Sequence, residues 1–275
     1  MTEGTSATVA TKKKINWAEE VWQLFLLALA VLAVHTAVAK PFYIPSGSML
    51  PGLLVGDRLI VSKYPYGYSY LSPSLNVLPK MDGRLFGSLP ERGDIVVLKS
   101  PIAQDDWIKR VIGLPGDTVQ MKDGQLWLNG QPVPKLKLAD TVMKVTPNSD
   151  CATMIDAQFR VITPDGTAEC HLPTYRETLP GGRTYTVLDL ANLPQDNTEP
   201  VIVPEGHVFL MGDNRDNSED SRFPAEVGGL GLLPVENIVG RAEFTTFSLD
   251  GSTSLNPVTW VTALRDRWFL SLRDN

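Results

Sequence analysis

The chain has 275 residues, of which 43% are hydrophobic and 20% are charged. This balance is typical of a globular protein with a substantial core, and it excludes wholesale disorder. The formal net charge of −6, with no basic stripe along the sequence, gives no electrostatic reason to expect nucleic acid as a partner.

The first predicted element is a membrane-spanning helix. Residues 21–39 carry no charged side chain, and as a helix they would extend about 29 Å, the thickness of one hydrocarbon core. A cleavable signal peptide is the alternative, because Ala37-Val38-Ala39 has the spacing of a cleavage site. The uncharged run is longer than the apolar region of a signal peptide, which favours an uncleaved anchor. No second run of this kind follows, so the sequence predicts a single span.

Charges on the two sides of this span predict its orientation. Three lysines at residues 12–14 precede it, whereas Lys40 and Arg58 follow it. This bias favours a cytoplasmic N-terminal tail, residues 1–20, with everything after Ala39 exported.

The two cysteines fit an exported domain. Cys151 and Cys170 are the only cysteines in the chain, and in that compartment a pair is more typical of a disulfide than of a metal site. The three histidines show no zinc-type spacing with them. We therefore expect a disulfide, no metal and no cofactor.

The exported part has the pattern of an all-β domain. Two turn signals, Asp123-Gly124 and Asn129-Gly130, are flanked by alternating apolar residues and predict β-hairpins. The more polar residues 118–206 are interpreted as an inserted smaller β subdomain, which divides a catalytic β core into residues 40–117 and 207–250. The runs that read most clearly as strands are Arg58–Lys63, Asp94–Lys99, Trp107–Ile112, Val208–Met211 and Ile238–Phe244.

The last predicted element is an amphipathic helix over residues 251–275. Asn256 is the expected N-cap, Pro257 stands at the first helical position, and apolar residues recur at helical spacing after it. Arginines alternate with aromatic side chains in this tail, as in a helix that lies on a lipid surface. A helix docked on the β-domain fits the pattern almost as well.

Three segments have a composition that suggests chemistry. Ile44–Pro51 contains Ser48 shortly after the span, although a Ser/Gly linker would look similar. Trp107–Asp117 places Lys109 inside an apolar strand, where a lysine that discourages edge aggregation is the alternative. Met211–Arg222 is dense in turn formers, acids and arginines, and it lacks the spacing of a calcium loop.

No histidine is placed to serve as the base of a serine hydrolase. His35 falls in the predicted span, His171 in the polar insertion and His207 at a strand start. Of the adjacent Lys109 and Arg110, only the lysine can lose its proton, so it is the candidate base.

Taken together, the three segments resemble the serine, lysine and Gly-Asp-Asn-Arg-Asp-Asn-Ser boxes of bacterial type I (leader) signal peptidases. The resemblance is dense over residues 41–63, 94–117 and 207–222. It implies an all-β catalytic domain with a signal-peptidase-like fold behind one transmembrane helix. It also implies a membrane-bound serine endopeptidase that removes N-terminal signal peptides from exported preproteins through a Ser–Lys dyad.

The resemblance assigns roles to individual residues. Ser48 would be the nucleophile, and Lys109 would be the general base, kept neutral by apolar surroundings. Ser46 and the Ser48 amide would stabilise the oxyanion. The supporting residues would be Ser218, which would hydrogen-bond and orient the lysine, the ion pair of Asp220 with Arg222, and Asp213 and Arg215 of the same box.

The resemblance also implies where the substrate binds and where the protein resides. A preprotein would add as a strand between residues 41–44 and 104–108. The partners would be preproteins and membrane lipid, with the monomeric enzyme in the bacterial cytoplasmic (inner) membrane and its catalytic domain on the outer (periplasmic) face. The implied substrate-binding residues are Pro41, Phe42, Tyr43, Ile44, Pro45, Asp106, Trp107 and Ile108.

Two other functions remain open from the residues alone. A self-cleaving Ser–Lys autoprotease would be expected to carry a DNA-binding domain in place of the apolar span. A non-enzymatic β-domain anchored in the envelope would tolerate replacement of Ser48 or Lys109.

Overall fold

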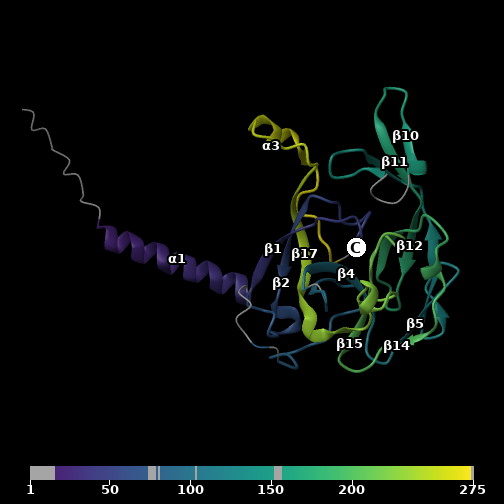
Figure 1. The fold of residues 1–275 in the computed structure, drawn as a ribbon, viewed down its shortest axis with the longest axis horizontal. Coiled ribbons are helices and arrows are strands. Elements are labelled where there is room, and N and C mark those ends of the chain that lie inside the picture. The colour runs from purple at the N-terminus through teal and green to yellow at the C-terminus, as the bar shows by residue number, and fades with distance from the viewer. Residues whose placement is uncertain (1–15, 74–78, 80, 103, 152–156, 274–275) are drawn as a thin grey trace, which may run out of the picture.

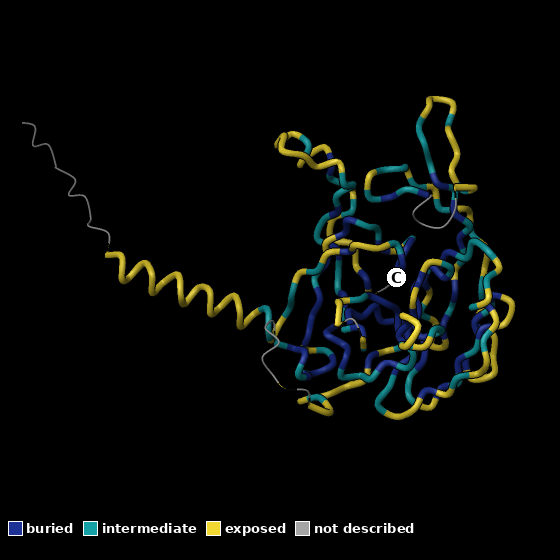
Figure 2. Tube along the Cα trace, in the orientation of Figure 1, coloured by how far each residue is buried: buried dark blue, intermediate teal, exposed yellow. Residues whose placement is uncertain are grey.

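One long helix stands apart from the rest of the molecule. The computed structural model describes residues 16–73, 79, 81–102, 104–151 and 157–273, so the lysines at 12–14 lie outside the described part. Helix α1 (Trp17–Ala37) extends away from the β-strands and buries none of its residues (Figures 1 and 2). It is long and apolar enough to cross a membrane. The helix begins and ends earlier than the predicted residues 21–39, because the chain turns at Val38 and Ala39 already belongs to a strand.

The strands after α1 form an eight-stranded antiparallel sheet. Its order is β1-β2-β17-β3-β4-β15-β16, with β18 paired to β17. Each of the five runs read as a strand from the sequence forms one here. The bounds are β1 (Ala39–Tyr43), β2 (Asp57–Ser62), β3 (Ile95–Lys99), β4 (Asp106–Gly113), β15 (His207–Met211), β16 (Leu233–Pro234), β17 (Ile238–Leu249) and β18 (Leu264–Arg265).

The insertion between β4 and β15 is also built of strands. Its described strands form three small sheets, with the orders β14-β5-β6-β7, β13-β12-β8 and β10-β11-β9. The two predicted hairpins are confirmed, because β5 pairs with β6 around residues 123–124 and β6 pairs with β7 around residues 129–130. The bounds are β5 (Thr118–Lys122), β6 (Gln125–Leu128), β7 (Gln131–Pro132), β8 (Lys135–Lys137), β9 (Thr141–Lys144), β10 (Arg160–Ile162), β11 (Ala168–Leu172), β12 (Thr174–Thr178), β13 (Thr184–Leu188) and β14 (Val201–Ile202).

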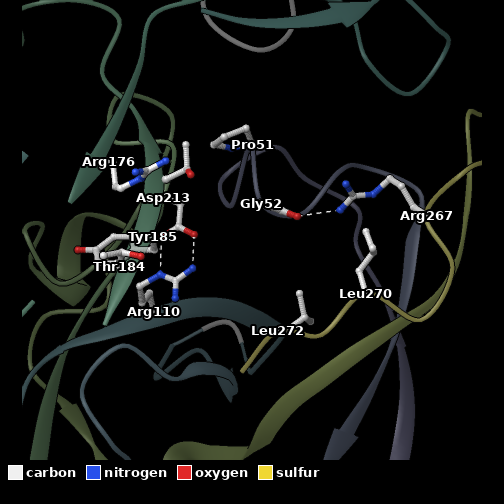
Figure 3. Close-up of a pocket in the computed structure, with 11 residues that line it drawn as sticks. Pro51, Gly52, Arg110, Arg176, Thr184, Tyr185, Asp213, Arg267, Leu270 and Leu272 are labelled. Atoms are coloured by element: carbon white, nitrogen blue, oxygen red, sulfur yellow. Dashed lines mark hydrogen bonds and ion pairs between the residues drawn. The ribbon is translucent and has the colours of Figure 1, made fainter. Parts of the chain in front are cut away.

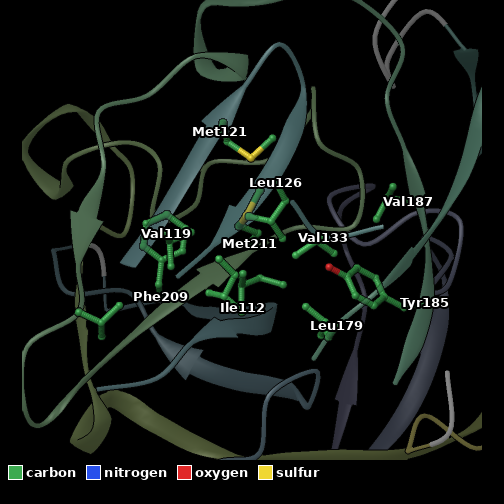
Figure 4. Close-up of a cluster of buried hydrophobic side chains, with 12 residues drawn as sticks. Ile112, Val119, Met121, Leu126, Val133, Leu179, Tyr185, Val187, Phe209 and Met211 are labelled. Atoms are coloured by element: carbon green, nitrogen blue, oxygen red, sulfur yellow. The ribbon is translucent and has the colours of Figure 1, made fainter. Parts of the chain in front are cut away.

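The insertion shares a hydrophobic core with the large sheet. Ile112 of β4 and Phe209 and Met211 of β15 pack in one buried cluster with residues of the insertion such as Val119 and Leu126 (Figure 4). Burial of apolar side chains is the main favourable term in folding, so these shared contacts couple the two parts. The insertion therefore helps to hold the strand that carries Lys109.

The cysteines connect a second cluster to the serine segment. Cys151 and Cys170 form a disulfide, as predicted, with their Cα atoms 5.6 Å apart. Both are buried in a cluster with Leu188 of β13 and with Leu50, which lies two residues after Ser48. The disulfide thus supports the loop that carries the candidate nucleophile.

The predicted C-terminal helix over residues 251–275 is wrong in its extent. Of its described residues, which end at 273, only α3 (Val258–Thr262) is helical, and the chain then pairs with β17 through β18. Further along, Leu272 is buried against the large sheet, and its amide donates to the carbonyl of Glu243. Pairing with an available strand satisfies the backbone groups that the helix would have satisfied internally. Trp260 and Phe269 remain exposed.

Candidate active site

Ser48 lies in a loop whose other residues are anchored in the core. The loop follows β1, and Ile44, Met49 and Leu50 are all almost completely buried. The third segment adds two hydrogen bonds, because the amide of Asn214 donates to the carbonyl of Ser48 and its side-chain amide donates to the carbonyl of Gly47, each at 3.0 Å. A loop held at both ends and in the middle gives the hydroxyl of Ser48 one defined position.

Lys109 projects from the middle of β4 toward that hydroxyl. Its Nζ lies 3.1 Å from Oγ of Ser48 and 3.1 Å from the carbonyl oxygen of Ile108. The indole ring of Trp107 lies on the same face of β4, with its centre 5.3 Å from Nζ. The structure thus brings together two side chains that are separated by 61 positions in the sequence.

Burial makes this lysine easier to deprotonate. Only 4% of Lys109 is exposed, and this loss of hydration lowers its pKa from 10.5 to about 8. The negative charges of Asp220, Glu219 and Asp213 act in the opposite direction but are outweighed. About a tenth of Lys109 is therefore a neutral amine at pH 7, with a lone pair able to accept a proton.

The carboxylate that most favours the charged lysine, Asp220, is neutralised by its own partner. Asp220 and Arg222 form a fully buried ion pair, with Nε and Oδ1 2.9 Å apart. Burial disfavours the charged carboxylate, but Arg222 outweighs burial and holds the pKa of Asp220 below its ordinary value. Asp220 also accepts a hydrogen bond from the amide of Gly212. The predicted ion pair is thus present, and it reduces the tendency of Asp220 to keep Lys109 protonated.

Ser218 does not make the hydrogen bond that was predicted for it. Its Oγ is buried without a hydrogen-bond partner in the described part of the chain, and the predicted bond to Lys109 is not formed. Ser218 nevertheless lines the same cleft as Lys109 and Ser48. It packs on Gly212, where an added Cβ would lie 2.2 Å from Oγ of Ser218 and 2.6 Å from the carbonyl oxygen of Ser48. Only glycine at position 212 lets the third segment approach both serines.

Two further buried ion pairs hold the third segment in place. The carboxylate of Asp213 accepts hydrogen bonds from Nε and a terminal nitrogen of Arg110, at 2.8 and 2.7 Å. Arg215 donates to Glu177 of β12 at 2.9 Å. The sequence identified Asp213 and Arg215 but not these partners. An arginine beside the lysine in an apolar strand was a signal for a buried carboxylate, whereas nothing local distinguished Glu177.

A cleft of 660 Å³ opens beside Ser48 and Lys109. Two strand edges near it are free in the described part of the chain, because β1 pairs only with β2, and residues 106–109 of β4 pair only with β3. Such edges can accept a peptide as an added strand. Among the predicted residues, the cleft is lined by Pro45, Ser46, Ser48, Asp106, Trp107, Ile108, Lys109 and Ser218.

Other predicted substrate residues do not line this cleft. Ile44 is buried in the core, and Pro41, Phe42 and Tyr43 form β1 outside the cleft. A separate pocket of 390 Å³ borders Pro51 and Gly52 on the serine segment (Figure 3). The pocket includes the Arg110–Asp213 pair, and Arg267 there donates to the carbonyl of Gly52 at 2.7 Å. The residues around this pocket therefore support the serine loop, and the pocket itself is not lined by Ser48.

The arrangement defines a class of enzyme. No histidine lines the cleft among the described residues, and the group beside the serine hydroxyl is a buried lysine with a lowered pKa. A serine next to a group that can accept its proton, in a cleft with open strand edges, is the site of a serine peptidase. The base available here is an amine.

Comparisons with known proteins agree with this class. The profile of the family described as "Signal peptidase, peptidase S26" matches residues 16–247. The signal peptidase I of Rickettsia massiliae (strain Mtu5) is 34% identical over 86% of this chain and 83% of its own length. That of Rickettsia typhi (strain ATCC VR-144 / Wilmington) is 36% identical over 82% of this chain and 77% of its own length. The chain belongs to the signal peptidase family, peptidase S26, which confirms the resemblance.

A solved structure of a family member was also found. A signal peptidase I from Enterococcus faecalis V583 aligns with 25% sequence identity over 56% of this chain and 97% of its own, with a TM-score of 0.29.

Proposed function

We propose that this chain removes signal peptides from exported preproteins, with Ser48 as the nucleophile and Lys109 as the general base. The observation that carries the assignment is the 3.1 Å approach of a buried amine with a lowered pKa to the serine hydroxyl. Membership of the signal peptidase family supplies the substrate class. An anchored β-domain without activity would have no need to bury an amine beside a serine in an open cleft.

The geometry supports a two-step acyl transfer. Neutral Lys109 accepts the proton of Ser48, whose Oγ bonds to the carbonyl carbon of the substrate. The amide of Ser48 and the hydroxyl of Ser46, whose Oγ lies 3.5 Å from that of Ser48, stabilise the oxyanion. Lys109 then returns the proton to the departing amine as the peptide bond breaks. Water, deprotonated by Lys109, hydrolyses the ester and regenerates Ser48.

The direct test is cleavage of a preprotein by the purified full chain in detergent. We expect release of the mature protein at a single site after a small residue, read by the masses of both products. Replacing that small residue of the substrate with tryptophan should prevent release, because the resemblance to signal peptidases implies a small pocket for the residue before the cut. Cutting at many sites, or no cutting of a folded and soluble preparation, would contradict the proposed function.

The pH dependence follows from the state of Lys109. Only the neutral amine accepts a proton, so kcat/KM should rise with pH, close to tenfold per unit below about 8, and level off above that pH. Burial also lowers the pKa of Lys63 to about 8, so the variant Lys63→Met is the matched control. It should keep the same profile. A rate that does not change between pH 6 and 10 would exclude a lysine base.

We place the β-domain on the outer face of a bacterial cytoplasmic membrane, with α1 as the anchor. Only Val38 separates the end of α1 from β1, so the strand edge proposed to receive the substrate begins at the membrane surface. A signal peptide that spans the same bilayer would present its cleavage site at this level. Protease added to spheroplasts should degrade the β-domain while sparing a tag at the N-terminus; protection of the β-domain would reverse the topology.

A further inference from the structure

A cluster of three aspartates lies where the insertion meets the third segment. Asp189 follows β13, Asp196 ends a short 3-10 turn (Pro194–Asp196), and Asp216 belongs to the segment that carries Ser218. One carboxylate oxygen from each of the three lies within 4.8 Å of the others. A cavity of 310 Å³ borders Asp189 and Asp196. The fold thus brings together three acids that are spread over a long stretch of sequence.

Each aspartate uses one oxygen for a structural contact. Oδ2 of Asp216 accepts the amides of Leu190 and Ala191, the latter at 2.9 Å. Oδ2 of Asp196 accepts the amide of Leu193 at 2.7 Å, and Oδ2 of Asp189 contacts Nζ of Lys135.

Two of the remaining oxygens are left without partners in the described part of the chain. Oδ1 of Asp196 and Oδ1 of Asp216 are both buried, and neither has a hydrogen-bond partner in the described part of the chain. Asp196 as a whole is 97% removed from solvent, since only 3% of it is exposed. A buried carboxylate oxygen with no donor loses hydration without compensation, which is costly. Two such oxygens in one cluster point to a missing positive group.

The charges in the cluster indicate what that group is. Among the described residues, Lys135 is the one cation that forms an ion pair with this cluster, and of the three aspartates it contacts Asp189 alone. The balance is two negative charges, which one divalent ion would neutralise. The cluster offers carboxylate oxygens and no nitrogen or sulfur ligand, and such a set suits a hard cation, with water completing the coordination.

We propose that Asp189, Asp196 and Asp216 bind a calcium ion. The absence of a metal was expected from the sequence because no ligand spacing was visible, and these three aspartates form no spacing motif. Calcium accepts irregular sets of six to eight oxygens, so it tolerates ligands from three separate loops better than magnesium does. The ion would tie the insertion to residue 216, which also lines the catalytic cleft. It would hold the segment that supports Lys109.

The test is the thermal unfolding of the full chain in detergent at neutral pH, after treatment with chelator. Added calcium chloride should raise the melting temperature in a saturable way, by about 3–6 °C at ten times the dissociation constant. Magnesium at the same concentration should raise it less. An unchanged melting temperature with calcium would overturn the proposal, whatever the enzyme does to preproteins.

Two variants make the assignment specific. Asp196→Asn keeps an acceptor for the amide of Leu193 but removes one charge, so it should lose the calcium-dependent shift. Asp140→Asn makes the same change at an exposed aspartate of the insertion and should keep the shift. Loss of the shift in both variants, or in neither, would contradict a site at the cluster.

A shared proton is the competing occupant. Burial, with the charges of Asp189 and Asp196, raises the pKa of Asp216. If a proton fills this role, the untreated protein should gain stability on mild acidification and should not respond to calcium. That pair of results would also overturn the proposal.

Discussion

Replacing Ser48 with alanine is expected to lower kcat for preprotein cleavage by about 10⁶-fold, the effect of removing the nucleophile of a serine peptidase. Oγ of Ser48 is the only hydroxyl within hydrogen-bond distance of Nζ of Lys109 in the described part of the chain. The fold should survive, because the buried neighbours Met49 and Leu50 hold the loop. The measurement is single-turnover release of the mature protein, with the melting temperature as the check on folding.

Ser46→Ala is the matched control for that variant. It removes a hydroxyl only 3.5 Å away, but as an oxyanion donor, so its loss should lower kcat by about 10²–10³-fold. Comparable losses in the two variants would leave the identity of the nucleophile open to Ser46. Cleavage by Ser48→Ala near the wild-type rate would exclude the proposed mechanism.

Replacing Asp213 with asparagine is expected to lower the free energy of unfolding by about 3–5 kcal/mol. Asp213 and Arg110 are almost completely buried, with side-chain exposures of 1% and 2%, and they meet through two hydrogen bonds. The substitution keeps the size of the side chain but leaves the guanidinium charge in the interior without its carboxylate. The measurement is the shift of the melting temperature in detergent.

Glu91→Gln is the control, because it also removes one carboxylate from an arginine. The Glu91 side chain is 74% exposed and pairs with Arg183 at 3.2 Å, so the change should cost no more than about 1 kcal/mol. If both variants lose the same stability, the Arg110–Asp213 pair contributes no more than a surface pair. If Asp213→Asn keeps wild-type stability, another group in the interior must compensate Arg110.

Much of the fold and the centre of the site could be predicted from the sequence. Apolar runs bounded by turn residues identified β2, β3, β4, β15 and β17, because strand formation depends on local alternation and on the residues that end it. Ser48 and Lys109 were identifiable through the resemblance of the three segments to the boxes of signal peptidases, since a linker or an edge-strand lysine would explain either residue alone. The apolar helix was evident from length and composition alone.

Contacts between distant segments were decided only by the tertiary structure. Glu177 and Arg215 have no pattern in common, and neither do the three aspartates of the cluster; they meet because the insertion packs its apolar face against β4 and β15. The tail has the periodicity of a helix, yet Leu272 is buried against the large sheet. Its amide donates a hydrogen bond to the backbone carbonyl of Glu243 in β17, so the tail pairs with a strand in place of forming a helix. Local sequence specifies which backbone a segment prefers, whereas burial and the partners of buried charges depend on which surfaces the whole chain brings together.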